Sequence, residues 1–336
     1  MKSTFRIGLN GFGRIGRAVY RIAQSHSDIE IAHINDPAPA ETLIHLLKYD
    51  SVHGAFPLDL HLNNSMLFCR SIPTLITHHR NPQDIPWLQS KLDVIIDCSG
   101  FFLDTASAQM HLQAGVPRVL LSAPPKDDHI KTVVYGVNQS CIEATDTVIS
   151  NASCTTNCAA PMLSVLKSFG IEEAYVTTVH SYTNDQRLLD GPHNDLRRAR
   201  AAAMSIIPTS TGAAKALTRI FPELNGRIGG CGMRVPVPDG SLTDITCVLS
   251  TPVQLQQINA AFKHASETHL KGIMGYTDDP IVGVDVIGNA NSVLFDSEFT
   301  SIVGNLVKVI GWYDNEWGYS NRLIDITRYW LQKSLH

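Results

Sequence analysis

The chain has 336 residues, of which 44% are hydrophobic and 17% charged, with 27 Lys and Arg against 31 Asp and Glu. At roughly 150 residues per domain this length predicts two folded domains, and the composition excludes disorder as the main state. A net charge of -4 provides no general cationic surface for nucleic acid or anionic lipid, and no apolar run reaches the roughly 20 residues that cross a bilayer. The N-terminus lacks the apolar core of a signal peptide. We therefore expect a cytoplasmic protein without a membrane or nucleic-acid partner.

The first 150 residues alternate short β-rich runs with helix-length amphipathic stretches. The predicted strands are Phe5–Asn10, Ile29–Asn35, Val94–Cys98, Val119–Ser122 and Thr147–Ser150. The predicted helices are Ile15–Gln24, Thr42–Leu47 and Thr105–Ala114. Because several strands are continuous apolar runs, they are expected to be buried on both faces, as in a parallel sheet covered by helices. This pattern predicts an α/β domain of the doubly wound Rossmann type over residues 1–152.

After about Ala152 the segments become longer and alternate in polarity, which is typical of an antiparallel sheet with one covered face. The predicted strands are Ala174–His180, Gly230–Val237, Ser241–Thr251 and Leu306–Tyr313, and the predicted helices are Gly212–Phe221, Leu255–Glu267 and Tyr319–Leu335. The stretch Thr183–Ile207 has no periodicity, and structured segments of that length are usually functional. We expect an α+β catalytic domain over residues 153–319, with a mainly antiparallel sheet.

A glycine-rich turn follows the first predicted strand. Gly11, Gly13 and Gly16 fit the spacing G-x-G-x-x-G and open a helix, whose N-terminus attracts phosphate groups. Asp36 lies twenty residues beyond Gly16, where a carboxylate can bind an adenosine ribose and repel a 2′-phosphate. The coincidence of strand, glycines, helix and acid therefore favours NAD over NADP. Further residues expected near the cofactor are Asn10, Arg14 and Ile15 in the same turn, and Ser99 and Gly100 at the end of another strand.

Seven cysteines are scattered without a C-x-x-C pair, which fits reduced thiols and gives no zinc-ligand spacing. We therefore expect no metal. Cys154 lies among small polar residues just before an apolar-periodic stretch, so a helix should begin there and favour its thiolate. Cys158, one helical turn later, is expected to be inert. His180 closes a strand-like run and is the candidate partner of Cys154, although one histidine among fourteen has little standing alone.

Longer motifs in the same order resemble phosphorylating glyceraldehyde-3-phosphate dehydrogenases from end to end. They are Ile7–Arg17, Ser150–Asn157, His180–Gln186, Arg197–Arg200, Ser205–Gly212 and Trp312–Ser320. The resemblance implies NAD-dependent oxidation of glyceraldehyde 3-phosphate through a thioester on Cys154, with His180 as its catalytic partner. It also implies a homotetramer whose terminal helix, residues 320–335, returns to the cofactor domain.

The resemblance assigns further residues to ligands. For the cofactor they include Ser122 and also Asn315, which would hold the nicotinamide carboxamide. Thr183, Asp185 and Arg234 would line the pocket for the phosphate of the substrate. Those expected around inorganic phosphate are Ser153, Thr155, Arg198, Thr211 and Gly212. Arg197 is adjacent to Arg198, and counting back from Thr211 favours Arg198.

Two departures from the family are visible: the chain is one residue shorter around Gly170–Ala174, and Leu60–Ser71 lacks a charged hairpin. Erythrose 4-phosphate as substrate, or arsenate in place of phosphate, would use the same chemistry. Other semialdehyde dehydrogenases also combine a glycine turn with a cysteine, but should lack the downstream motifs. A non-enzymatic NAD-responsive protein, perhaps one contacting RNA, would leave the settings of Cys154 and His180 unexplained.

Overall fold

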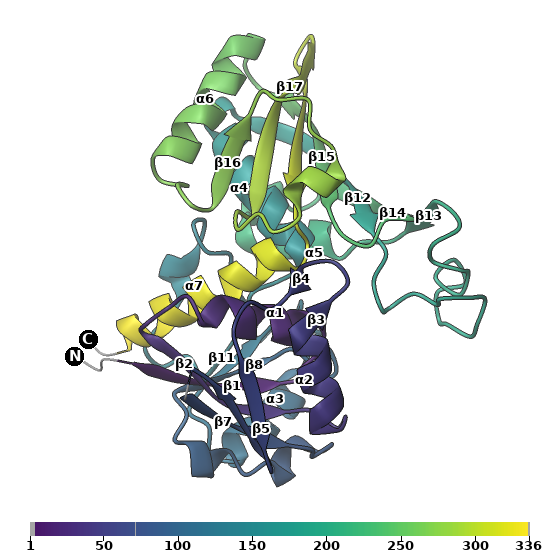
Figure 1. Cartoon of the computed structure of the whole chain (residues 1–336). Helices are drawn as coiled ribbons and strands as arrows, with labels where there is room; N and C mark the ends of the chain where they lie inside the picture. The colour runs from purple at the N-terminus through teal and green to yellow at the C-terminus, as the bar shows by residue number, and fades with distance from the viewer. Residues whose placement is uncertain (1–3, 71, 335–336) are drawn as a thin grey trace. The chain divides into compact units, whose positions relative to one another are not determined.

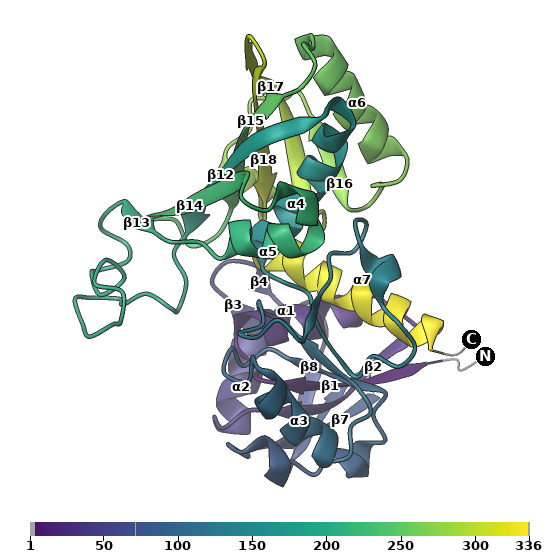
Figure 2. The ribbon, with the colours of Figure 1, turned by 180° about the vertical axis from the view of Figure 1, so that it is seen from behind.

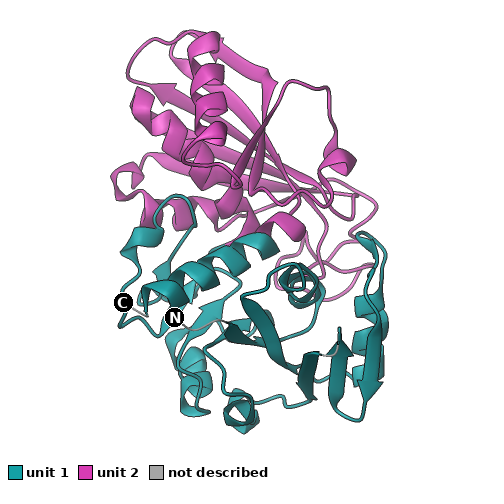
Figure 3. Ribbon diagram, turned by 60° about the vertical axis from the view of Figure 1, so that its left-hand side comes forward, with its two compact units in different colours: residues 1–152, 320–336 teal, residues 153–319 magenta. Residues whose placement is uncertain are grey.

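The structure is a computed structural model that describes residues 4–70 and 72–334. Its contacts divide the chain into unit 1, which is Met1–Ala152 with Ser320–His336, and unit 2, which is Ser153–Tyr319 (Figure 3). Each unit is built around its own sheet. None of the helices in the described part of the chain combines the length and apolar character needed to cross a membrane.

Unit 1 contains a nine-stranded sheet in the order β10-β11-β9-β8-β1-β2-β7-β6-β5 (Figure 1). The strands are β1 (Phe5–Asn10), β2 (Ile29–Asn35), β5 (Leu60–Asn63), β6 (Met66–Cys69), β7 (Ile72–Thr77), β8 (Val94–Asp97), β9 (Val119–Leu121), β10 (Lys131–Thr132) and β11 (Val148–Ser150). From β10 to β7 every pairing is parallel. The order reverses between β1 and β8, which is where ligands bind in doubly wound sheets. The predicted Rossmann-type sheet is therefore confirmed.

Unit 1 also contains α-helices. They are α1 (Arg14–Ala23), α2 (Ala40–Lys48), α3 (Thr105–Gln113) and most of α7 (Trp317–Lys333), with a short ladder of β3 (Tyr49–Asp50) and β4 (Gly54–Ala55) after α2. In α7, Leu323, Ile324 and Trp330 are fully buried, and the turns from Ser320 onward belong to this unit. The predicted end of this helix at Leu335 lies outside the described residues.

Two features of unit 1 were not predicted from the sequence. In the segment that was expected to lack a charged hairpin, β5 and β6 pair as a hairpin whose strands contain no Asp, Glu, Lys or Arg, and Asn64 closes it with a left-handed φ of 51°. Its apolar residue Leu67 is fully buried, so this hairpin is held by packing rather than by charges. The strand β7 was not predicted either, because Pro73 interrupts its pattern.

Unit 2 contains a seven-stranded sheet in the order β13-β14-β12-β15-β18-β17-β16 (Figure 2). The strands are β12 (Ile171–Ser181), β13 (Ile207–Thr209), β14 (Ile228–Val235), β15 (Ser241–Leu249), β16 (Met274–Thr277), β17 (Val293–Val303) and β18 (Leu306–Tyr313). Four pairings are antiparallel, and only β12 with β14 and β16 with β17 are parallel. The helices α4 (Cys154–Leu166), α5 (Ala213–Ile220) and α6 (Leu255–Glu267) pack against its strands. The predicted α+β architecture is confirmed.

Between β12 and β13 the chain forms no regular element, as the sequence indicates. Within it an isolated bridge joins Arg187 to Ala201. The turns on either side leave several large apolar side chains exposed, which are Leu188, Leu189, Leu196, Met204 and Ile206. Such a concentration of exposed apolar residues is unusual for a surface that faces only water.

Candidate active site

Each of the three glycines in the turn of unit 1 has a different steric environment. Gly11 has φ +90°, and a Cβ there would lie 2.7 Å from the backbone nitrogen of Ser99. A Cβ at Gly16 would lie 2.2 Å from the carbonyl oxygen of Gly11. At Gly13, by contrast, a Cβ would meet no atom within 4 Å, and no side chain caps the helix that Gly13 begins. The turn is thus closed on the protein side and open at Gly13, as a cradle for a pyrophosphate requires.

A cavity of about 730 Å³ lies beside the glycine turn, at the carboxyl ends of β1, β2 and β8. It is lined by Asn10, Gly11, Gly13, Asn35, Asp36, Pro37, Ala38, His79, Arg80, Cys98, Ser99, Phe101 and Phe102. Asp36 follows β2 directly, and its two oxygens accept hydrogen bonds from the backbone nitrogens of Phe12 at 2.7 Å and Ala38 at 2.9 Å. The carboxylate is therefore held in place within the cavity wall. An apolar cavity with one fixed carboxylate and an open helix N-terminus fits the adenosine and pyrophosphate of a dinucleotide.

Several predicted cofactor residues do not line this cavity. Arg14 forms an ion pair with Asp50 at 2.8 Å, so its guanidinium is engaged within unit 1. Gly16 serves the close packing described above, and Ile15 and Gly100 are absent from the cavity wall. The backbone nitrogen of Ser122 donates to the carbonyl oxygen of Asp97 at 3.0 Å, which makes its visible contact a structural one.

The sequence analysis missed a buried polar pair, Asp97 and His111, that contacts residues of the cavity wall. Asp97 is fully buried and accepts hydrogen bonds from Asn10 Nδ2 at 2.8 Å and from the nitrogen and Oγ of Ser99 at 2.9 and 2.6 Å. Its other neighbour is His111 Nε2 at 3.1 Å. Because Trp87 Nε1 donates to His111 Nδ1, Nε2 carries a proton and donates it to Asp97. The acidic residue in the otherwise apolar run Val94–Asp97 was the signal for it.

In unit 2, Cys154 is the first residue of α4. Ser153 is the N-cap of this helix, and its Oγ accepts a hydrogen bond from the nitrogen of Thr156 at 3.1 Å. His180 lies one residue before the end of β12 and is 5% exposed. Its Nε2 is 3.4 Å from Sγ of Cys154. The strand end and the helix start therefore bring the predicted nucleophile and base into contact.

Burial of this pair opposes the ionised thiol that the sequence analysis expects. Burial raises the pKa of Cys154 to about 11, although the positive charge of Arg234 acts in the opposite direction. Burial, followed by Arg234, lowers the pKa of His180 to about 3. At neutral pH the structure therefore favours a thiol beside a neutral imidazole. The helix start that was expected to ionise the sulfur does not compensate for the loss of water around it.

Two arginines extend the site beyond His180. Nη1 of Arg234 lies 2.7 Å from His180 Nδ1 and donates to the carbonyl oxygen of Ser181 at 2.8 Å. Arg198 donates to Asp185, to Thr209 Oγ1 and to the carbonyl oxygen of Ser210. Its charge also contributes to the lowered pKa of His180. Asp185 thus faces a cation rather than an empty pocket wall, which explains a carboxylate in a region expected to bind phosphate.

The remaining predicted residues of unit 2 lie at the ends of elements. Thr155 Oγ1 is 3.0 Å from the hydroxyl of Tyr313, which the sequence analysis did not select. The nitrogen of Thr183 donates to Gln186 Oε1. Thr211 Oγ1 accepts from the nitrogen of Ala213, and Gly212 is the N-cap of α5. Cys158 is fully buried, and burial raises its pKa, in keeping with an inert thiol.

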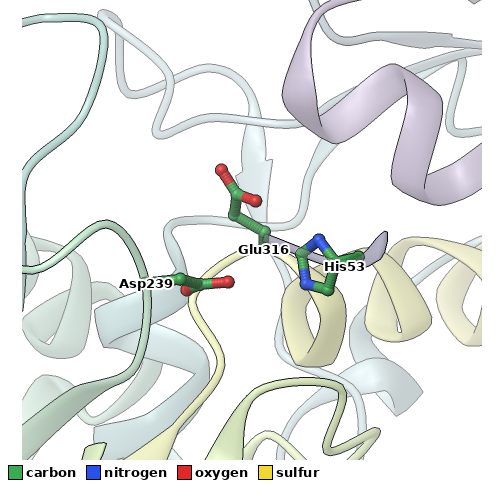
Figure 4. A group of neighbouring side chains, drawn as sticks. All are labelled: His53, Asp239 and Glu316. Carbon is green, nitrogen blue, oxygen red and sulfur yellow. The ribbon is translucent and has the colours of Figure 1, made fainter. Parts of the chain in front are cut away.

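A further acidic residue was also missed. Asp239 is 2% exposed, and burial, together with the charges of Asp314 and Glu316, raises its pKa well above the usual range. Figure 4 shows Asp239 and Glu316, which both belong to unit 2, and also labels His53, which belongs to unit 1. Asp239 directly precedes Gly240, which is followed by β15.

The chain matches two family models. One is described as glyceraldehyde 3-phosphate dehydrogenase, NAD binding domain, over residues 5–105, and the other as the C-terminal domain of the same enzyme over residues 153–315. A protein named glyceraldehyde-3-phosphate dehydrogenase 2 from Streptomyces avermitilis is 49% identical, with 96% of this chain and 98% of that protein covered. Proteins named glyceraldehyde-3-phosphate dehydrogenase from Mycobacterium avium and Priestia megaterium are each 48% identical, covering 96% and 98% of this chain and 97% and 99% of theirs.

Proposed function

This chain belongs to the glyceraldehyde-3-phosphate dehydrogenase family, and from that premise we propose how its residues carry out the reaction. It is an NAD-dependent enzyme that oxidises glyceraldehyde 3-phosphate with uptake of phosphate. The observation that carries the proposal is the separation of 3.4 Å between Cys154 Sγ and His180 Nε2, beside two arginines. A nucleophile within reach of a base, next to fixed cations, suits an aldehyde that bears a phosphate.

In the proposed reaction Sγ of Cys154 attacks the aldehyde carbon, and the thiol proton passes through His180 Nε2 to the new hydroxyl group. Nε2 then takes the proton of that hydroxyl as a hydride leaves the same carbon, and a thioester remains on Cys154. NAD, when bound, supplies the hydride acceptor. An oxygen of inorganic phosphate next attacks the thioester carbon, the C–S bond breaks, and Cys154 leaves with a proton from His180. The product is an acyl phosphate.

The cofactor is assigned to the glycine turn and Asp36 of unit 1, with Asn315 at its nicotinamide. The open position at Gly13 and the fixed carboxylate of Asp36 support this assignment. For the phosphate of the substrate we propose Thr183, Asp185 and Arg234. For inorganic phosphate we propose Arg198 together with Ser153, Thr155, Thr211 and Gly212.

We also propose the domain assignment that these roles require. Residues 1–152 with 320–335 form the NAD-binding domain, and residues 153–319 form the catalytic domain. The division of contacts into two units and the residues matched by the two family models support it. The test is to measure the affinity for NAD in variants of Asp36 and of Cys154. A variant of Asp36 should bind NAD less tightly, whereas a variant of Cys154 should lose catalysis and keep its affinity for NAD.

Self-association into a homotetramer is proposed from the segment between β12 and β13. Leu188, Leu196 and Met204 are 83%, 81% and 77% exposed, more than expected for side chains of this size on a monomer. Charging one of them, as in Leu188→Asp, should lower the molar mass in analytical ultracentrifugation. A cytoplasmic location is proposed because all seven cysteines are free thiols.

The decisive assay follows nicotinamide reduction with glyceraldehyde 3-phosphate, with and without inorganic phosphate. It is repeated with erythrose 4-phosphate, with arsenate and with NADP. Phosphate-dependent turnover that is fastest with the triose and NAD supports the proposal. Faster turnover of erythrose 4-phosphate would reassign the substrate, and dinucleotide binding without any turnover would reject the proposed mechanism.

A further inference from the structure

The side-chain oxygen of Asn315 accepts two hydrogen bonds from buried serines. Ser181 Oγ donates to Oδ1 at 2.9 Å and Ser241 Oγ donates to it at 2.7 Å. The exposed fractions of Ser181, Ser241 and Asn315 are 0%, 1% and 5%. The serines lie at the end of β12 and the start of β15, and Asn315 lies just after β18, so three neighbouring strands of the sheet of unit 2 bring them together.

The donors and acceptors around Asn315 fix the orientation of its side-chain amide. Ser241 Oγ already accepts a hydrogen bond from the backbone nitrogen of Ser181 at 3.1 Å, so its own hydrogen is free to be donated to Asn315. Both lone pairs of Asn315 Oδ1 are then occupied. Turning the amide over would deprive two buried hydroxyl groups of their acceptor, which is costly where water is excluded. Nδ2 makes no hydrogen bond to any of the described residues and remains available to a ligand.

Ser181 connects this amide to the catalytic base. Its carbonyl oxygen lies 2.8 Å from His180 Nδ1 and accepts a hydrogen bond from Arg234 Nη1 at 2.8 Å. The backbone of Ser181 therefore holds the imidazole, and its hydroxyl holds the amide of Asn315. Ser181 therefore contacts both His180 and Asn315, the residue proposed to hold the nicotinamide.

We propose that Ser181 and Ser241 are positioning residues that fix the amide of Asn315 so that its Nδ2 donates to the carbonyl oxygen of the nicotinamide carboxamide. This inference rests on the proposed role of Asn315. A carboxamide has both a donor and an acceptor end, and a freely turning asparagine would bind either end. A fixed donor selects the carbonyl end and so selects one orientation of the nicotinamide ring.

The test compares ligands that differ only at the nicotinamide. In the full-length enzyme, the dissociation constants of NAD and ADP-ribose are measured by calorimetry for the wild type, Ser181→Ala and Ser241→Ala. The affinity for NAD should fall about five- to twentyfold, as expected for a lost buried hydrogen bond, and that for ADP-ribose should stay unchanged. The 3-acetylpyridine analogue of NAD keeps the carbonyl and lacks the amino group, so it should lose affinity to the same extent as NAD.

Controls separate positioning from a structural defect. Ser297→Ala removes another buried serine of unit 2, whose Oγ donates to the carbonyl oxygen of Thr277, and should change neither affinity. Ser241→Thr retains the hydroxyl and should recover part of the NAD affinity. Equal losses for NAD and ADP-ribose in the alanine variants, or no loss for either ligand, would overturn the inference.

Asn315→Ala distinguishes this inference from the proposed function. If Asn315 holds the nicotinamide, its removal lowers NAD affinity, and adding Ser241→Ala causes no further loss. If Asn315→Ala leaves the ratio of NAD to ADP-ribose affinity unchanged, the proposed role of Asn315 fails. If only the serine variants leave that ratio unchanged, Asn315 keeps its role and the positioning by serines is rejected.

Discussion

Nη1 of Arg234 lies 2.7 Å from Nδ1 of His180, so a permanent cation touches the ring that is proposed to act as the base. A protonated imidazole would add a second positive charge at this distance, in a site where His180 is 5% exposed. The guanidinium therefore helps to keep the imidazole neutral and ready to take a proton. The same cation is the group to which the phosphate of the substrate is assigned.

Replacing Arg234 by a neutral residue should raise the pKa of His180. Arg234→Gln should raise the pKa of His180 above about 3, because the cause that ranks second after burial is removed while burial remains. Histidine NMR signals followed from pH 3 to 8 measure this shift. Arg227→Gln, at an exposed arginine of the same unit, is the control and should leave the signal of His180 unchanged. A pKa that stays near 3 in Arg234→Gln would leave burial and Arg198 as the causes of the shift.

The covalent mechanism predicts that Cys154→Ser abolishes aldehyde oxidation. A hydroxyl group is a far weaker nucleophile at neutral pH, so kcat should fall by at least about a thousandfold. NAD affinity should stay close to that of the wild type, because the glycine turn and Asp36 are untouched. Cys141→Ser, which changes an exposed thiol of unit 1, should retain activity. Oxidation at a near-normal rate in Cys154→Ser would reject the thioester.

The parts of the fold that follow from local patterns were predicted from the sequence. Phe5–Asn10 and Ile29–Asn35 are largely buried strands on either side of a glycine turn, and both end at the predicted residues. The strand Val293–Val303 was missed because buried polar residues interrupt its pattern. Asp296 is one of them, and its carboxylate accepts a hydrogen bond from Trp312 Nε1 at 2.9 Å, a partner sixteen residues away. Only the folded chain shows that such a residue is satisfied inside a sheet.

The same limit applies to the site. The polar residues around Cys154 and the strand end at His180 predict a nucleophile and a base, yet their ionisation depends on burial that the sequence does not reveal. Ser241 has no local signal either, because its role arises from strand pairing with residues 60 and 74 positions away in sequence. Motif spacing therefore predicts which groups react, and long-range packing decides their charge and orientation.

The open space at Gly13 predicts a variant that folds normally but binds NAD poorly. Gly13→Ala places a methyl group where no protein atom lies within 4 Å, so the free energy of unfolding should change by less than about 1 kcal/mol. The affinity for NAD should nevertheless fall tenfold or more, because the methyl group would occupy the space assigned to the pyrophosphate. Calorimetric titration with NAD measures the loss, and thermal denaturation measures the stability. Gly191→Ala, in an irregular segment of unit 2, is the control. Unchanged affinity in Gly13→Ala would move the pyrophosphate away from this turn.

Asp36→Ala should loosen selection against NADP. The variant removes the negative charge from the cavity wall and also the acceptor for the nitrogens of Phe12 and Ala38. The ratio of kcat/KM for NADP to that for NAD should rise about tenfold or more, while catalysis with NAD declines. Asp59→Ala, at an exposed aspartate of the same unit, should leave the ratio unchanged. An unchanged ratio in Asp36→Ala would place the ribose contact elsewhere.

The raised pKa of Asp239 makes a prediction about stability and pH. Burial, and then the charges of Asp314 and Glu316, favour the protonated form of Asp239 in the folded chain, whereas the unfolded chain releases that proton near pH 4. The folded state thus holds the extra proton, so its stabilisation is complete below about pH 4 and is progressively lost as the pH rises toward the folded pKa. Asp239→Asn carries no such proton, and its urea midpoint should fall less steeply than that of the wild type between pH 5 and 8.5. Asp278→Asn, at an exposed aspartate of unit 2, should keep the wild-type slope. Parallel slopes for the wild type and Asp239→Asn would show that Asp239 is ionised in the folded chain at neutral pH.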